Sequence, residues 1–197
     1  MPKGIPLTEE EMANRRREIA RVAIQLFTEN GFNETSMRQI AEAVGAGKST
    51  IYDYFKTKDD ILLSYFEDEI QAITCRAEEV DRLQLPAAEK LRQVLHAQLD
   101  YMMANKKFYL RLTIEAQRLG FESQQRLQVS RHGYQDLICR LIDSGIREGS
   151  FRPVDSFLCM RIILSVLGPA VFTTRPTGTP QEMLESSLDI ILRGIQA

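Results

Sequence analysis

The chain has 197 residues, of which 44% are hydrophobic and 26% are charged. That composition supports a folded core and excludes a disordered chain. The net charge of −2 excludes a protein covered with positive charge for nucleic acid, so any DNA binding must be local.

The chain carries no segment typical of export or membrane insertion. Its first residues, MPKGIPLTEEEMANRRR, include no apolar stretch of the kind found in signal peptides. The longest apolar run, residues 157–167, is interrupted by Arg161 and is too short to cross a bilayer, so a buried helix is predicted there. We therefore expect a cytoplasmic protein with no membrane partner.

Cysteines and histidines give no indication of a disulfide or a metal site. Cys75, Cys139 and Cys159 lie far apart in apolar helical segments, which is typical of free, buried thiols. Neither His96 nor His132 has cysteines or carboxylates clustered around it at ligand spacing. We expect no metal and no cofactor.

Helical patterns dominate, and no run of alternating β-branched residues predicts a strand. The first helix begins with a capping box formed by Thr8 and Glu11 and ends at Gly31. The later predicted helices cover about residues 36–44, 48–55, 58–80, 86–105, 108–119, 123–148, 155–172 and 180–195.

The change from short helices to long ones falls near Lys58. We therefore predict two domains, residues 1–58 and residues 59–197. The predicted fold is all-α, with an N-terminal three-helix domain containing a helix-turn-helix over about residues 35–55, followed by a larger helical domain.

The segment over residues 35–58, TSMRQIAEAVGAGKSTIYDYFKTK, carries the chemistry. Its Gly47-Lys48-Ser49-Thr50 resembles the end of a phosphate-binding loop. That loop needs a strand before it and a glycine five residues before Gly47, but the preceding segment is helical and Glu42 occupies the glycine position. A nucleotide-hydrolysing enzyme is therefore the weaker interpretation.

A helix-turn-helix explains the same segment better. Thr35 or Ser36 caps one short helix, Gly45 supplies a left-handed turn, and a second short helix follows. The second helix then turns Lys48, Ser49, Tyr52 and Asp53 outward, toward solvent or DNA. The polar face of a plain helical bundle is the alternative. The candidate DNA-binding residues are Thr35, Ser36, Arg38, Ala46, Gly47, Lys48, Ser49, Tyr52, Tyr54 and Lys58.

Several of these candidates have a predicted contact. Lys48 and Ser49 lie in the first turn of the second helix, from which base edges are usually reached. The Tyr52 hydroxyl and Lys58 suit the phosphate backbone, as do the backbone N–H groups after Thr35 or Ser36. The consecutive arginines at positions 15–17 are further candidates for phosphate contacts.

The spacings of residues 15–62 resemble the TetR/AcrR family of bacterial regulators. The matching elements are Ala23-x-x-Leu26-Phe27, Gly31-Phe32 with Thr35, Ile40-Ala41, Gly45, and Lys48-x-Thr50-Ile51-Tyr52-x-Tyr54-Phe55-x-x-Lys58. The segment over residues 145–155 also fits the family's turn between two C-terminal helices. The chain departs from the family at Gly47, where members carry a serine cap, and at Ser49, where they carry a smaller residue.

The resemblance implies a homodimeric repressor that binds double-stranded operator DNA and is released by a small, mainly apolar effector. It also implies that the last two helices form the dimer interface, although burial within one subunit is the alternative. The candidate interface residues are Leu184, Leu188, Ile191 and Ile195.

Polar or soft side chains on the apolar C-terminal helices are candidates for the effector pocket, with a core position as the alternative for each. They are His96, Met102, Met103, Tyr109, Thr113, Gln117 and Tyr134. A protein-interaction module and an enzyme remain as alternative functions, which promoter binding and ATP turnover would separate from a regulator.

Overall fold

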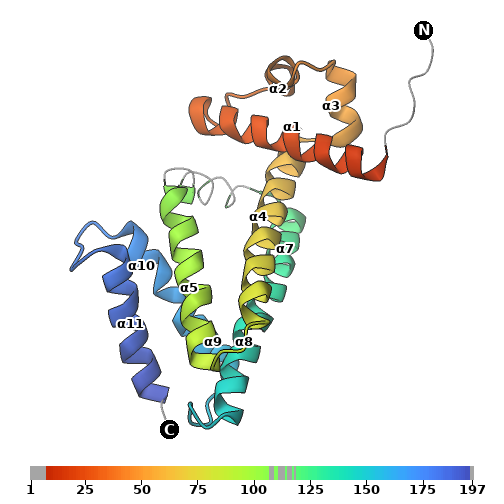
Figure 1. The fold of residues 1–197 in the computed structure, drawn as a ribbon. Helices are drawn as coiled ribbons and strands as arrows, with labels where there is room; N and C mark the ends of the chain where they lie inside the picture. Colours follow the sequence, from red (N-terminus) through yellow and green to blue (C-terminus); the bar gives the residue numbers. More distant parts are fainter. Residues whose placement is uncertain (1–7, 107–108, 111–113, 115–116, 118, 196–197) are drawn as a thin grey trace. The chain divides into compact units, whose positions relative to one another are not determined.

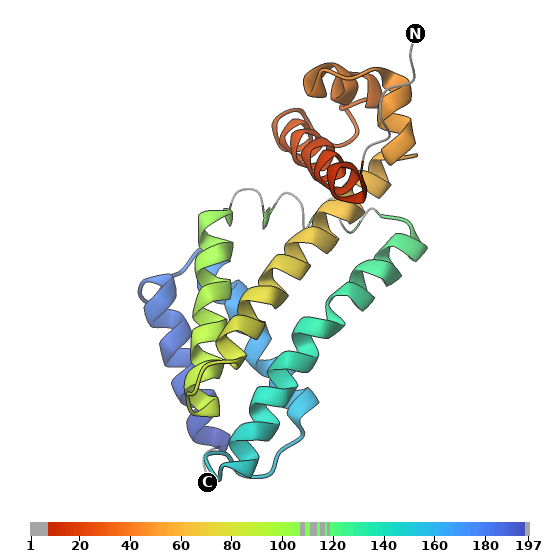
Figure 2. The same cartoon turned by 45° about the vertical axis from the view of Figure 1, so that its right-hand side comes forward.

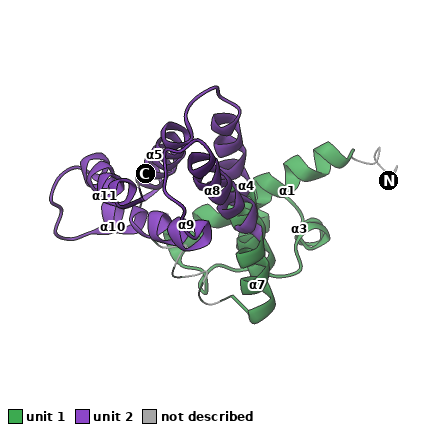
Figure 3. Cartoon of the chain, turned by 90° about the horizontal axis from the view of Figure 1, so that it is seen from below, with its two compact units in different colours: residues 1–69, 110–129 green, residues 70–109, 130–197 purple. Residues whose placement is uncertain are grey.

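The computed structural model describes residues 8–106, 109–110, 114, 117 and 119–195 (Figure 1). These residues form helices and turns with no β-strand among them, which confirms the all-α prediction. None of the described helices is long and apolar enough to cross a membrane. The chain divides into two compact units, residues 1–69 with 110–129 and residues 70–109 with 130–197 (Figure 3).

Unit 1 contains the predicted three-helix domain. Its helices are α1 (Glu9–Asn30), α2 (Met37–Val44), α3 (Lys48–Tyr54), the first part of α4 (Lys58–Asp81) and nearly all of α7 (Phe121–Ser130). The predicted boundary at Lys58 coincides with the start of α4, but that helix is continuous and its first turns belong to unit 1.

Helix α1 is the scaffold of unit 1. Thr8 and Glu11 form the predicted capping box, in which the Glu11 amide donates to the Thr8 hydroxyl at 3.2 Å and the Thr8 amide to the Glu11 carboxylate at 2.8 Å. Ile19, Ala23 and Phe27 recur at four-residue spacing and are buried on one face of the helix. Helix α2 packs against both α1 and α3 (Figure 1).

Unit 2 is built around α5 (Ala87–Ala104), which has α11 (Pro180–Ile195) on one side and α8 (His132–Arg147) on the other (Figures 1 and 2). Helices α9 (Ser156–Ser165) and α10 (Leu167–Phe172) complete the unit with the second part of α4. Leu91, Leu95 and Leu99 form the buried stripe of α5.

Two predicted helices are each divided in the structure. The helix expected over residues 155–172 breaks at Val166, because Pro169 lacks an N–H and its ring clashes with the carbonyl of Ser165, four residues earlier. The helix expected over residues 123–148 breaks at Arg131, which separates α7 from α8, just before the weak helix former Gly133.

Three smaller expectations can be compared with the structure. Pro86 precedes α5 as its N-cap and is not its first helical residue. Cys139 and Cys159 are buried as expected, but Cys75 is exposed on α4. Most of the helix expected over residues 108–119 lies outside the described residues.

Candidate DNA-binding interface and effector unit

Ser36 caps α2. The Gln39 amide donates to the Ser36 hydroxyl at 3.2 Å, and the Ser36 amide donates to the Gln39 side chain at 2.8 Å. Thr35, the other predicted cap, is 1% exposed, and its hydroxyl donates to the carbonyl of Gly31 at 2.7 Å. The Thr35 side chain therefore belongs to the core of unit 1 and is not available to DNA.

The turn between α2 and α3 depends on Gly45. Its φ of 68° and ψ of 32° are left-handed, a conformation that costs any residue with a Cβ atom. The Ala46 amide then donates to the Ala41 carbonyl at 2.9 Å and closes the end of α2. Gly47 is the N-cap of α3 and makes no side-chain capping bond.

Helix α3 has a buried side and an exposed side. Ile51 and Phe55 are buried against the rest of unit 1, whereas Lys48 and Ser49 are exposed in the first turn. Tyr52 is half-buried, and the Lys48 Nζ lies 5.7 Å from the centroid of its ring. Lys48, Ser49 and part of Tyr52 therefore lie outside the buried side of α3, as does the exposed Asp53.

Three other candidates are exposed or partly exposed. Arg38 on α2 is strongly exposed and pairs with Glu42 at 2.8 Å, one turn along the same helix. Ala46 is half-buried in the turn. Tyr54 is half-buried in the groove between α3 and α1.

Two basic candidates face inward. Lys58 donates to the carbonyls of Phe32 at 2.5 Å and Asn33 at 3.3 Å, and its ammonium lies 4.7 Å from the centroid of the Phe32 ring. Arg16 donates to the carbonyl of Tyr54 at 2.7 Å. Both cations are therefore used inside unit 1, which departs from the phosphate contacts predicted for them.

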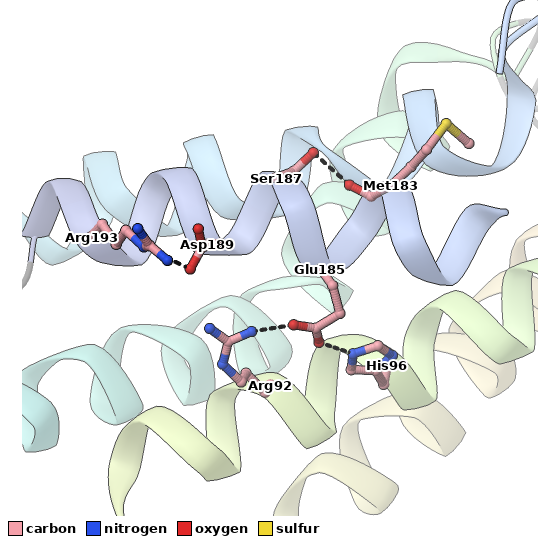
Figure 4. A network of polar contacts seen from close by, with 7 residues as sticks. All are labelled: Arg92, His96, Met183, Glu185, Ser187, Asp189 and Arg193. Carbon is pink, nitrogen blue, oxygen red and sulfur yellow. Dashed lines mark hydrogen bonds and ion pairs between the residues drawn. The ribbon is translucent and has the colours of Figure 1, made fainter. Parts of the chain in front are cut away.

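The effector candidates do not form one cluster. Tyr134 is buried, and its hydroxyl donates to Gln98 at 2.5 Å; burial raises the pKa of this hydroxyl, so it stays protonated. His96 instead lies toward α11, where it contacts the Glu185 carboxylate together with Arg92 (Figure 4). His96 therefore joins two helices.

The other effector candidates are also scattered. Met102 is buried in the core of unit 2, and Met103 is partly buried against it. The Tyr109 ring stacks on Phe172 with centroids 5.7 Å apart. Gln117 is exposed in unit 1, and Thr113 lies outside the described residues.

The candidate interface residues of α11 are buried within the subunit, which is the alternative given for them above, and an interface formed by the last two helices stays a prediction. Leu184 and Leu188 are fully buried in the core of unit 2, Ile195 is also buried there, and Ile191 packs against that core. Most of the apolar residues of α11 form one stripe, and sequence periodicity does not show whether that stripe packs inside its own subunit or against a second one. The apolar side chains left exposed in this part of the chain are Phe157, Leu158 and Ile162 on α9, and Ile190 on α11.

The fold and the exposed α3 face define a helix-turn-helix protein with a separate helical unit. Residues 19–65 match the family model for bacterial regulatory proteins of the tetR family. Residues 84–195 match the model for the tetracyclin repressor-like C-terminal domain. The chain belongs to the TetR family of transcriptional regulators, as the sequence resemblance predicted.

Similar proteins include known regulators. The chain is 25% identical over 182 residues to the fatty acid metabolism regulator protein of Bacillus subtilis, covering 90% of this chain and 94% of that one. It is 25% identical over 194 residues to the transcriptional repressor KstR2 of Mycolicibacterium smegmatis, covering 96% and 95%. The structure of FadR from Bacillus subtilis in complex with stearoyl-CoA shares the fold, with a TM-score of 0.79, 24% identity and coverage of 91% and 99%.

Proposed function

We propose that this protein is a homodimeric repressor that binds operator DNA and is released by a ligand with a long apolar chain, in place of the small, mainly apolar effector expected from the sequence. The observation that carries the proposal is the exposed face of α3, where Lys48, Ser49 and Tyr52 project from a short helix seated on α2. A short helix held in this way is the element that enters the major groove in helix-turn-helix proteins.

The face divides into two kinds of contact. Lys48 and Ser49 lie in the first turn of α3, within reach of base edges when the N-terminal end of the helix enters the groove. The Tyr52 hydroxyl and the backbone N–H groups at the Ser36-capped start of α2 suit phosphate oxygens. Gly47 adds backbone that can approach the duplex closely, because it has no side chain.

Dimerisation uses the exposed apolar face of α9. Its inner side chains, among them Met160 and Ile163, are buried, but Leu158 and Ile162 are one turn apart and about half-exposed. Large apolar side chains clustered on a surface indicate a binding site. A second copy covering this face would form a dimer with two DNA-binding units. Their recognition helices must lie about 34–36 Å apart, or a multiple of that distance, to reach successive major grooves.

The effector site that we propose lies in unit 2 between α4 and α5. A small opening there, of about 10 Å³, is lined by side chains that include Ala77, Gln98 and Tyr101, with Arg76 also among them. That space holds at most one water, so an effector must separate the two helices to enter. Helix α4 continues into unit 1, which contains the DNA-binding helices. A ligand that displaces α4 therefore also acts on unit 1.

The effector we propose is a long-chain acyl-CoA. The related FadR structure holds stearoyl-CoA, and the helices of unit 2 present an apolar interior with the Tyr134–Gln98 pair as a polar group inside it. Arg76 supplies a positive charge for an anionic head group. A ligand of this kind releases DNA only if it binds the DNA-free conformation more tightly than the DNA-bound one.

The test is a footprint on the fragment upstream of the protein's own gene, repeated with stearoyl-CoA, with CoA alone and with stearate. We expect protection that disappears with stearoyl-CoA and persists with CoA. No protection of the fragment would contradict DNA-binding by this face, and protection unchanged by all three compounds would contradict the acyl-CoA assignment.

A further inference from the structure

Three consecutive arginines on α1 have different partners. Arg15 donates to Glu18 at 2.6 Å, and Arg17 donates to Asn14 at 2.6 Å, so the hydrogen bonds of both stay within their own helix, although the charge of Arg17 also acts on Asp68 of α4. Arg16, between them, reaches two other helices. Arg16 therefore differs from its two neighbours in its hydrogen-bond partners, although all three carry the same charge.

Arg16 makes two contacts at the C-terminal end of α3 and one with α4. Its Nη1 donates to the Tyr54 carbonyl at 2.7 Å, and its Nε donates to the hydroxyl of Ser64 on α4 at 3.2 Å. The guanidinium carbon also lies 4.1 Å from the centroid of the Phe55 ring. Tyr54 is the last residue of α3 and Phe55 its C-cap, so one side chain joins α1, α3 and α4.

The chemistry of these contacts suits arginine. The last carbonyls of a helix have no intrahelical partner and carry partial negative charge, which a cation satisfies. A guanidinium group is planar, so it can stack on an aromatic ring while its N–H groups donate hydrogen bonds sideways, parallel to the ring. An ammonium group has no such plane. Asp68 on α4 is also close: burial raises the pKa of its carboxyl, and the charges of Arg17 and Arg16 oppose that rise.

Helix α3 depends on such an anchor because it is short. It has seven residues, and Ile51 is its only buried one. That buried side chain and the packing on α2 fix where the helix lies, and its C-terminal end is held by other contacts. Phe55 and the Arg16 contacts hold the far end, so they determine the direction in which Lys48 and Ser49 project.

We infer that Arg16 is a positioning residue for DNA binding: it sets the orientation of α3 against α1 and α4 and does not itself contact the duplex. The inference rests on the proposed function, because it assumes that α3 is the helix that reads DNA. It replaces the phosphate contact that the sequence predicts for this arginine.

The test compares Arg16→Gln with Arg15→Gln and Arg17→Gln, each of which removes one positive charge from the same helical turn. Affinity for the upstream fragment is measured at a temperature where circular dichroism shows all variants fully folded. We expect Arg16→Gln to weaken binding by about tenfold or more, because the binding-competent orientation becomes less populated. The two matched variants should stay within about twofold of the natural protein.

A second pair of variants covers the case in which Arg16→Gln does not fold. Ser64→Ala removes only the α4 partner, and Arg16→Lys keeps the charge but loses the stacked plane; both should weaken binding in the same direction. Amide NMR shifts in the Lys48–Tyr54 helix should change in these variants and not in the matched ones, which a general loss of stability would not produce.

The outcomes separate the two levels of argument. If the natural protein protects no DNA, the proposed function fails and this inference fails with it. If the natural protein binds and all three glutamine variants weaken binding equally, Arg16 acts only through its charge and the inference alone is wrong. Unchanged affinity in Ser64→Ala and Arg16→Lys, with folding intact, overturns it as well.

Discussion

The Nζ of Lys48 lies 5.7 Å from the centroid of the Tyr52 ring, one turn further along α3. Side chains four residues apart on a helix share one face, so a duplex that meets one of these groups also meets the other. Lys48 is exposed and Tyr52 is half-buried. Changes that remove only the polar atoms of this pair should therefore alter DNA binding while leaving the core of unit 1 intact.

Tyr52→Phe tests the phosphate contact. The variant keeps the half-buried ring and loses only the hydroxyl, so it should fold normally. We expect binding to all DNA sequences to weaken about equally, by roughly 1.5–3 kcal/mol, as for one hydrogen bond to a charged group. Titrations of the upstream fragment and of an unrelated fragment measure both effects; loss on one fragment alone would indicate that Tyr52 meets a base.

Lys48→Ala distinguishes the two contacts open to this ammonium. If Lys48 meets a phosphate, the slope of log affinity against log salt concentration should fall by about one for each half-site. If it meets a base edge, sequence preference should relax at one position of each half-site with the slope nearly unchanged. Affinity equal to that of the natural protein at every salt concentration would place the DNA-reading face elsewhere.

Leu188→Glu and Leu158→Glu separate core from interface. Leu188 is fully buried, so a charge there should lower the free energy of unfolding by about 3 kcal/mol or more. We expect this loss to unfold unit 2. Leu158 is 57% exposed in the isolated subunit, so its variant should fold normally and sediment as a monomer. Circular dichroism and sedimentation velocity provide the two readouts. A folded, dimeric Leu158→Glu protein would exclude this face of α9 as the interface.

Local chemistry in the sequence predicted where several helices begin, although two of the predicted helices are each divided in the structure. The predicted capping box at Thr8 is present, a second capping box forms between Thr179 and Glu182, and the Asp155 carboxylate accepts from the Leu158 amide at 2.9 Å. Such caps involve neighbours within three residues, so they are fully encoded in a short stretch of chain. The helix-turn-helix was predictable for the same reason, because Gly45 and the apolar spacing around it are local.

Contacts between distant residues were not predictable in this way. Leu188 belongs to an apolar stripe whether that stripe packs in the core or against a second subunit. Only the packing of α11 on α5 and α10 shows that Leu188 is buried in the core. The residues next to Lys58 and Arg16 in the sequence predict that both cations are exposed. Their partners at Phe32 and Tyr54 lie 26 and 38 residues away, where periodicity carries no information.

Lys58→Met tests whether this lysine stabilises unit 1. Its ammonium joins the start of α4 to the carbonyl of Phe32, so the variant should lower the free energy of unfolding by about 1 kcal/mol. Lys56→Met is the matched change, because the exposed Lys56 ammonium donates to the backbone carbonyl of Tyr52, only four residues earlier. Urea unfolding of both variants gives the comparison. Equal stability would mean that the Lys58 contacts contribute nothing measurable.

Gly45→Ala and Gly47→Ser should change stability in opposite directions. A Cβ atom at Gly45 meets no other group within 4 Å, so the cost is that of the left-handed backbone, about 1 kcal/mol. Gly47 has extended backbone, and a Cβ there makes only ordinary contacts at 3.7 Å. Serine at that position can cap α3 and should raise the free energy of unfolding by about 0.3 kcal/mol. Thermal unfolding measures both, and a destabilised Gly47→Ser protein would contradict this account of the cap.

Glu185→Ala tests how α11 is held on α5. The Glu185 carboxylate accepts from Arg92 and contacts the His96 ring, and both partners lie on α5 (Figure 4). Asp189→Ala is the matched change, because Asp189 pairs at 2.9 Å with Arg193 on its own helix. Removing the link between helices should lower the free energy of unfolding by about 1 kcal/mol, since the pair is half-exposed and screened by solvent.

The Asp189 variant should change that free energy by less than about 0.5 kcal/mol, which is typical of a pair four residues apart on one helix. Urea unfolding followed by circular dichroism gives both values, and added salt should reduce the difference between them. If Asp189→Ala proved as damaging as Glu185→Ala, the link to α5 would have no special role. Docking of α11 would then rest on the buried leucines alone.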